Sequence, residues 1–175
     1  MKQGILSGGM QQDMNNASPE LQQEYDIFVS NGIRIIHGNA REAIINQLKG
    51  QEPADAVAMA TVGVIERIES GAADKGKKIN ESVLLNGANE LMNNIIELGE
   101  GSGAIKEMSE DDRVNAVKKA TGMYIKNALE SGKMTKEQLV QDAEALKQQF
   151  GEKSDPGQSP LARPRGYDSV AGVRG

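Results

Sequence analysis

The sequence predicts an all-α protein, a bundle of five to six helices with extended arms at its N- and C-terminal ends. Apolar residues recur at steps of three and four, which places them on one face of a helix. Helix-starting residues precede several of these stretches, and no stretch alternates apolar and polar residues as a half-buried strand does. The aromatic content of 3% leaves an aliphatic core, which suits packed helices.

The first predicted helix begins after Ser18 and ends near His37. Serine is a favoured N-cap residue, and the proline that follows it loses no hydrogen bond at the first helical position. The helix carries its apolar residues on one face. These residues are Leu21, Tyr25, Phe28, Gly32, Ile35 and Ile36.

Two further helices are predicted over 40–49 and 53–70. Gly50 ends the first of them, and a proline starts the second. The short helix carries Ala43, Ile44 and Leu48 on its apolar side. The longer helix has a wide apolar surface, which indicates a central helix that is buried on more than one side. Its members include Val57, Met59, Thr61, Val64, Ile65 and Ile68.

A fourth helix follows the polar turn 71–78 and is capped by Asn80. Glycines at 99, 101 and 103 end it. Its apolar face consists of Val83, Leu84, Ala88, Leu91, Ile95 and Leu98.

Capping boxes predict the starts of the fifth and sixth helices. Ser109 and Asp112 form the first box, and two more acidic residues in that turn complement the positive helix end. The fifth helix runs to about 131, with an apolar face of Val114, Val117, Thr121, Tyr124, Ile125 and Ala128. Thr135 and Gln138 form the second box, and the sixth helix ends before Gly151.

The chain therefore divides into an extended arm at 1–17, a helical domain at 18–151 and a second arm at 152–175. The second arm contains three prolines and four glycines, which disfavour helix and sheet. It holds four basic and three acidic residues, so its net charge is +1 and the rest of the chain carries −6. Arg and Tyr side chains are favoured anchors in protein interfaces. We therefore expect this arm to bind partners, through Leu161, Arg163, Arg165, Tyr167 and Arg174.

Residue counts exclude several kinds of site. The chain has no Cys, so it has no disulfide, thiolate metal site or cysteine nucleophile, and its single His37 excludes any site with two imidazoles. A net charge of −5 and few aromatic residues predict no affinity for nucleic acid, sequence-specific or general. No apolar stretch is long enough to span a bilayer, and residues 1–18 lack the apolar region of a signal peptide. We expect no cofactor, no metal and no enzymatic activity.

Four local patterns have residues of the kinds found in functional sites. Residues 71–78 read G-x-x-x-x-G-K-K, but a phosphate-binding loop needs Ser or Thr at position 78 and a preceding strand. A calcium loop that opens at Asp74 lacks the acidic residue at its twelfth position. His37 is expected to interact with the negative end of its helix. The fourth pattern is a set of acids expected to be solvated, namely Glu66, Glu69, Glu81, Glu90 and Glu97.

The overall pattern is similar to that of the small structural proteins associated with the virions of tailed bacteriophages. The segments that carry this resemblance are 1–9, 25–36, 86–91 and 163–167. The resemblance implies a non-enzymatic part present in many copies, near the portal and tail or among internal proteins ejected with the genome. It also implies a homo-oligomer in contact with other virion proteins, located in the virion and, during assembly, in the host cytoplasm.

Two other functions remain open from the sequence. The first is a cytosolic helical binding or regulatory module with disordered tails. The second is an enzyme, for which buried carboxylates around His37 would be required.

Overall fold

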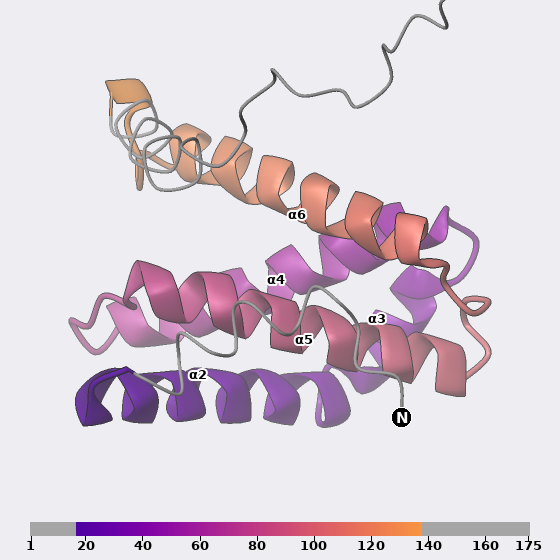
Figure 1. Cartoon of the computed structure of the whole chain (residues 1–175), viewed down its shortest axis with the longest axis horizontal. Helices are drawn as coiled ribbons and strands as arrows, with labels where there is room; N and C mark the ends of the chain where they lie inside the picture. Colours follow the sequence, from indigo (N-terminus) through magenta and orange to yellow (C-terminus); the bar gives the residue numbers. More distant parts are fainter. Residues whose placement is uncertain (1–16, 138–175) are drawn as a thin grey trace, which may run out of the picture. The chain divides into compact units, whose positions relative to one another are not determined.

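The structure is a computed structural model that describes residues 17–137 (Figure 1). Within that range the secondary structure is helical, with no strand. The five helices whose bounds are given below belong to one compact unit that ends at Ser131. The predicted all-α fold is therefore confirmed. The helices are α2 (Pro19–His37), α3 (Arg41–Leu48), α4 (Pro53–Ala73), α5 (Glu81–Gly101) and α6 (Glu110–Glu130).

Several predicted segments fall mainly outside the described residues. Residues 132–137 belong to a second compact unit, in which 136 and 137 are helical. The remainder of the sixth predicted helix lies outside the described range, as does the whole C-terminal arm at 152–175. Of the N-terminal arm only Ala17 is described, and it is partly buried against the core.

Side chains cap the helices at the positions that the sequence predicts. The Ser18 hydroxyl accepts a hydrogen bond from a first-turn amide of α2, and the Asn80 side chain does the same for α5. Ser109 and Asp112 form a reciprocal capping box at the start of α6. The start of α4 has a cap that the sequence analysis did not predict, because the carboxylate of Glu52 accepts from a first-turn amide. Local residue chemistry therefore sets where these helices begin.

The helix α4 is longer than predicted, since it continues to Ala73 rather than ending at Ser70. The amides of Lys75 and Lys77 both donate to the carbonyl oxygen of Ala72, which closes the end of the helix. Gly76 between them has a φ of +68°, a backbone conformation that glycine adopts without strain. The G-x-x-x-x-G-K-K pattern is thus the last turn of a helix and an exposed loop, without a preceding strand.

Three long helices, α2, α4 and α5, pack against one another around the main core. The short helix α3 contacts all three, and α6 packs chiefly on α4 (Figure 1). The carboxylate of Glu24 accepts from the amide of Asn80 at one end of the α2–α5 pair, and Gly32 faces Leu91 further along. These two contacts show that α2 and α5 run in the same direction.

Two glycines allow α2 and α5 to approach closely. A Cβ atom added at Gly32 would overlap the side chain of Leu91, and one added at Gly87 would overlap the ring of Phe28. Leu91 is fully buried and Phe28 is 2% exposed, so neither has free space into which to move. Each glycine therefore receives a large side chain from the opposite helix.

The buried face of α6 differs from the predicted one. Its buried residues are three alanines, of which Ala128 was predicted and Ala116 and Ala120 were not, whereas Thr121 is exposed. The Thr121 hydroxyl donates to a carbonyl oxygen one turn earlier in its own helix. Small side chains let α6 lie close to α4, so its larger apolar residues flank the contact and stay partly exposed.

Two other predicted core positions are wrong. Ala43 is exposed, and its neighbour Ile45 is buried in its place. Met59 is 40% exposed although most of α4 is buried. In both helices the apolar residues cover too wide an arc for spacing alone to decide which of them are buried. In α3, burial of Ile45 removes more apolar area from water than burial of Ala43 would.

Candidate functional site

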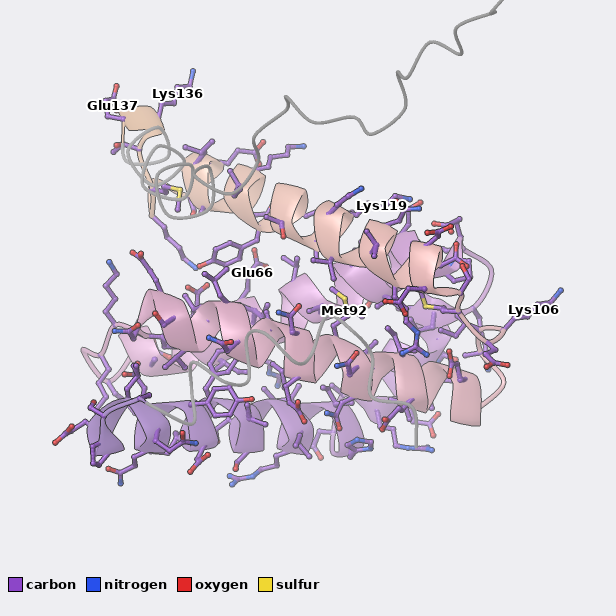
Figure 2. All side chains as sticks on the ribbon, viewed as in Figure 1. Glu66, Met92, Lys106, Lys119, Lys136 and Glu137 are labelled. Carbon is purple, nitrogen blue, oxygen red and sulfur yellow. The ribbon has the colours of Figure 1, made fainter. Side chains whose placement is uncertain are left out.

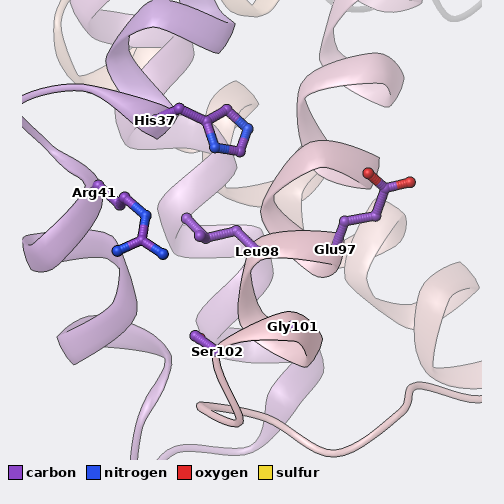
Figure 3. Close-up of a pocket in the computed structure, with 6 residues that line it drawn as sticks. All are labelled: His37, Arg41, Glu97, Leu98, Gly101 and Ser102. Carbon is purple, nitrogen blue, oxygen red and sulfur yellow. The ribbon is translucent and has the colours of Figure 1, made fainter.

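A shallow pocket of about 270 Å³ lies where three helix ends meet. The end of α2 contributes His37, the start of α3 contributes Arg41, and the end of α5 contributes the remaining lining residues (Figure 3). Those are Glu97, Leu98, Gly101 and Ser102. Leu98 is buried, whereas the other lining residues are exposed. The site is therefore an open, polar-edged depression with one apolar side chain beneath it.

Charged groups of both signs line this pocket, namely the guanidinium of Arg41 and the carboxylate of Glu97. Figure 3 shows the carboxylate of Glu97 pointing away from Arg41. A guanidinium can hold a carboxylate with two parallel hydrogen bonds. The hydroxyl of Ser102 donates to the carbonyl oxygen of Gly99, 3.2 Å away, and is not activated as a nucleophile by this contact.

The position of His37 agrees with the prediction that it lies at a helix end, because it is the last residue of α2. No buried carboxylate lines its pocket, since Glu97 is exposed. The sequence does not indicate Arg41 and Ser102 as neighbours of His37. They come together because the end of α5 meets the α2–α3 turn, and no local sequence pattern predicts that contact.

A second polar cluster holds α6 to α4 and corrects an expectation about the acids. Glu66 and Glu69 were expected to be solvated, but both are partly buried. Figure 2 shows where Glu66 lies. The Tyr124 hydroxyl donates to the carboxylate of Glu69 at 2.7 Å, and the Asn127 amide donates to that of Glu66 at 2.8 Å. Burial first, and then the hydrogen bond to Glu69, raise the pKa of Tyr124 above its usual value of 10.0.

Of the other acids expected to be solvated, Glu81 and Glu97 are exposed and confirm the expectation. Glu90 is partly buried and lies near Tyr25. Burial, followed by the negative charge of Glu90, raises the pKa of that tyrosine.

Ion pairs fix the other end of α6. The ammonium of Lys119 lies 2.7 Å from Asp55 and 3.2 Å from Glu52, at the start of α4 (Figure 2). These hydrogen bonds, first to Asp55 and then to Glu52, raise the pKa of Lys119. The guanidinium of Arg113 pairs with Glu100 at 3.3 Å. Because Lys119 lies beside the start of α4 and Asn127 beside a later turn, α4 and α6 run in the same direction.

Tyr124→Phe is expected to lower the free energy of unfolding by about 1 kcal/mol, because a partly buried hydrogen bond to a carboxylate is lost. The contribution of Tyr124 is fully present below pH 10 and is lost as the pH rises through its raised folded-state pKa. Urea unfolding at pH 8, and absorbance titration of the tyrosines above pH 10, measure both effects. Unchanged stability together with an unchanged titration curve would contradict this contact.

The remaining predictions concern the loop at Asp74, metal binding, membrane spans and the partner-binding residues. Asp74 and the lysines that follow it are exposed and lie in the loop between α4 and α5. In residues 17–137 there is no group of three or more His, Cys, Asp or Glu side chains able to hold a metal ion. No helix in that range is long and apolar enough to cross a membrane. The predicted partner-binding residues all lie outside the described range, namely Leu161, Arg163, Arg165, Tyr167 and Arg174.

Comparison with known proteins identifies no relative, because no protein family, curated protein or solved structure matches the chain.

Proposed function

We propose that this chain is a non-enzymatic structural or assembly component of a tailed-phage virion. In this proposal it is portal- or tail-associated, or an internal protein ejected with the genome. The supporting observation is the organisation of the chain, in which the helices between 19 and 130 are preceded and followed by segments of different composition, 1–17 and 152–175. Such segments can reach neighbouring subunits, and a ring requires contacts of this head-to-tail kind. The resemblance to virion proteins is the reason for placing this assembly in a tailed-phage particle.

The helical unit would act as a rigid block. Its long helices are joined by short connections, and its buried residues form one aliphatic cluster. Among residues 17–137, four large apolar side chains are exposed, of which Ile27 at 55% and Leu85 at 59% are the most exposed. These are available for contact with other subunits. The pocket at Arg41 is shallow and open, which fits a protein contact better than an enclosed substrate site.

The C-terminal arm would supply the anchors of this assembly. We expect the wild-type chain to form a discrete oligomer, and the double variant Arg163→Ser/Tyr167→Ser to dissociate at least tenfold more readily. Each anchor of this type contributes on the order of 1–2 kcal/mol, and 1.4 kcal/mol corresponds to a factor of ten. Sedimentation equilibrium over a concentration series measures the dissociation constant.

Arg67→Ser provides a matched control, because Arg67 is an exposed arginine on α4. Its dissociation constant should stay at the wild-type value. If the double variant and the control give the same constant, the arm does not anchor the assembly.

The alternative is a helical binding or regulatory module, and the pocket is the observation that favours it. An exposed guanidinium and an exposed imidazole over an apolar side chain can receive the carboxylate of a partner peptide. A chain that is monomeric at every concentration would favour this alternative over the assembly subunit.

A further inference from the structure

The helix α6 is held to the bundle differently from the other described helices. Its buried side chains are alanines, whereas α2, α3, α4 and α5 each bury at least one large apolar side chain. Larger residues of α6 reach the core only in part, namely Val117, Met123 and Tyr124. Burial of an alanine removes much less apolar area from water than burial of leucine or isoleucine, so apolar burial contributes little to the docking of α6.

Among the described helices, α6 packs on α4 and touches the others only slightly. The helix α4, by contrast, also contacts α2, α3 and α5. Figure 1 shows α6 along one edge of the bundle, with α2 at the opposite edge. If α6 moved away, the other four helices would therefore keep almost all of the contacts that they make with one another.

Polar contacts hold α6 to α4, and water reaches most of them. The ion pairs of Lys119 with Asp55 and Glu52 join side chains that are each at least 40% exposed. Such pairs stabilise a protein little, because solvent screens them. The hydrogen bonds that Tyr124 and Asn127 donate to α4 are partly buried, and in the open form water would replace their acceptors.

The part of α4 that α6 covers is apolar. Asp55, Glu66 and Glu69 all contact α6. Val62 follows Asp55 by seven positions and precedes Glu66 by four, so it lies on the same face of α4 as those residues. Its side chain is only 4% exposed. Movement of α6 would therefore uncover an apolar surface around Val62.

The chain just before α6 is fixed to the end of α5. Ile105 and Met108 are buried, and the amide of Met108 donates to the carboxylate of Glu100 at 2.9 Å. The next residue, Ser109, is extended, with φ −65° and ψ 164°. The ion pair between Arg113 and Glu100 lies beside this point. A change of backbone angles at Ser109 would thus turn α6 while the preceding loop stays in place.

We propose that α6 opens from α4 as one unit, pivoting at Ser109, while the other four described helices stay folded. The helix is thus a movable flap that covers the apolar face of α4 around Val62. Opening also displaces the point from which the chain continues beyond residue 130. This inference does not depend on the proposed assembly function, because its contacts lie within one chain, and either can fail without the other.

A thiol placed beneath α6 tests whether this face of α4 becomes accessible. The chain has no cysteine, so Val62→Cys introduces a unique thiol. Val57→Cys is the matched control, because Val57 is fully buried on the same helix, about 140° away around its axis. In native buffer, the thiol of Val62→Cys should react with a soluble aromatic disulfide at least tenfold faster than that of Val57→Cys. Equal rates would overturn the proposal, because both thiols would then need global unfolding.

Hydrogen exchange of the full chain tests whether α6 opens as one unit. The protected amides of α6 should share one protection factor, at least tenfold below that of the slowest amides in α2, α4 and α5. Protection that rises steadily from one end of α6 to the other would indicate fraying of single amides. That result would overturn the opening of the helix as a unit.

Ile95→Val separates opening of α6 from global unfolding. Ile95 is fully buried on α5, and loss of one methyl group should lower the protection of the slowest amides about two- to tenfold. The amides of α6 should keep their protection factor, because Ile95 stays packed in both the closed and the open form. An equal fall in α6 would overturn the proposal, because α6 would then unfold only together with the rest.

Ala120→Gly confirms that the exchange of α6 depends on its contact with α4. The substitution removes a buried methyl group and lowers helix propensity by an amount that corresponds to about a fivefold change. The protection of the α6 amides should fall at least fivefold. Unchanged protection would overturn the proposal, because those amides would then exchange without release of the helix.

Discussion

Leu91→Ala is expected to lower the free energy of unfolding by about 3–4 kcal/mol, the range typical of a large-to-small change at a fully buried leucine. Leu91 is 0% exposed and its methyl groups lie against Gly32 on the neighbouring helix. The glycine has no side chain that could fill the space left behind. Urea unfolding followed by circular dichroism measures the loss.

Leu85→Ala is the matched control, because Leu85 lies on the same helix and is 59% exposed. Its substitution should change the free energy of unfolding by less than about 0.5 kcal/mol. Similar losses in the two variants would mean that the wrong face of α5 has been assigned to the core.

Gly87→Ala and Gly63→Ala should change stability in opposite directions. Alanine improves helix propensity by about 1 kcal/mol at either position. At Gly87 the added methyl overlaps the buried ring of Phe28, and such overpacking costs about 1–3 kcal/mol. Gly63 is exposed on α4 and its new methyl would meet no atom within 4 Å. Because the propensity gain is common to both, the two variants should differ by the overpacking cost, about 1–3 kcal/mol, in urea unfolding.

A smaller partner residue should relieve the overlap at Gly87. In a Phe28→Leu background, Gly87→Ala should cost less than it does in the wild-type chain, and a double-mutant cycle measures that coupling. Additive effects would show that α2 and α5 do not approach each other through these two residues.

The parts of the fold that could be predicted from the sequence are those set by local chemistry. Ser18, Asn80 and Ser109 each accept a hydrogen bond from the first turn of the helix that follows them. Spacing of apolar residues on α2 likewise predicted the burial of Phe28 and Ile36. These signals need no knowledge of the neighbouring helices, because a cap or an amphipathic face lies within one stretch of chain.

The parts that could not be predicted depend on which helices meet. Spacing places Gly32 on the apolar face of its helix, but only the pairing of α2 with α5 shows why Gly32 and Gly87 are glycines. Glu66 and Glu69 look like ordinary surface acids until α6 brings their tyrosine and asparagine partners to them. The pocket beside Arg41 forms where the end of α5 meets the α2–α3 turn, which is distant from it in the chain, so spacing alone does not reveal it.

The central claim, that the chain is an assembly subunit joined through its arms, is tested most directly by its native mass. Light scattering on a sizing column would be carried out on the full chain and on a chain without residues 152–175. A discrete oligomer is expected for the full chain and a smaller species after truncation, with unchanged helical circular dichroism. A monomer in both cases, or an oligomer that truncation leaves intact, would contradict it.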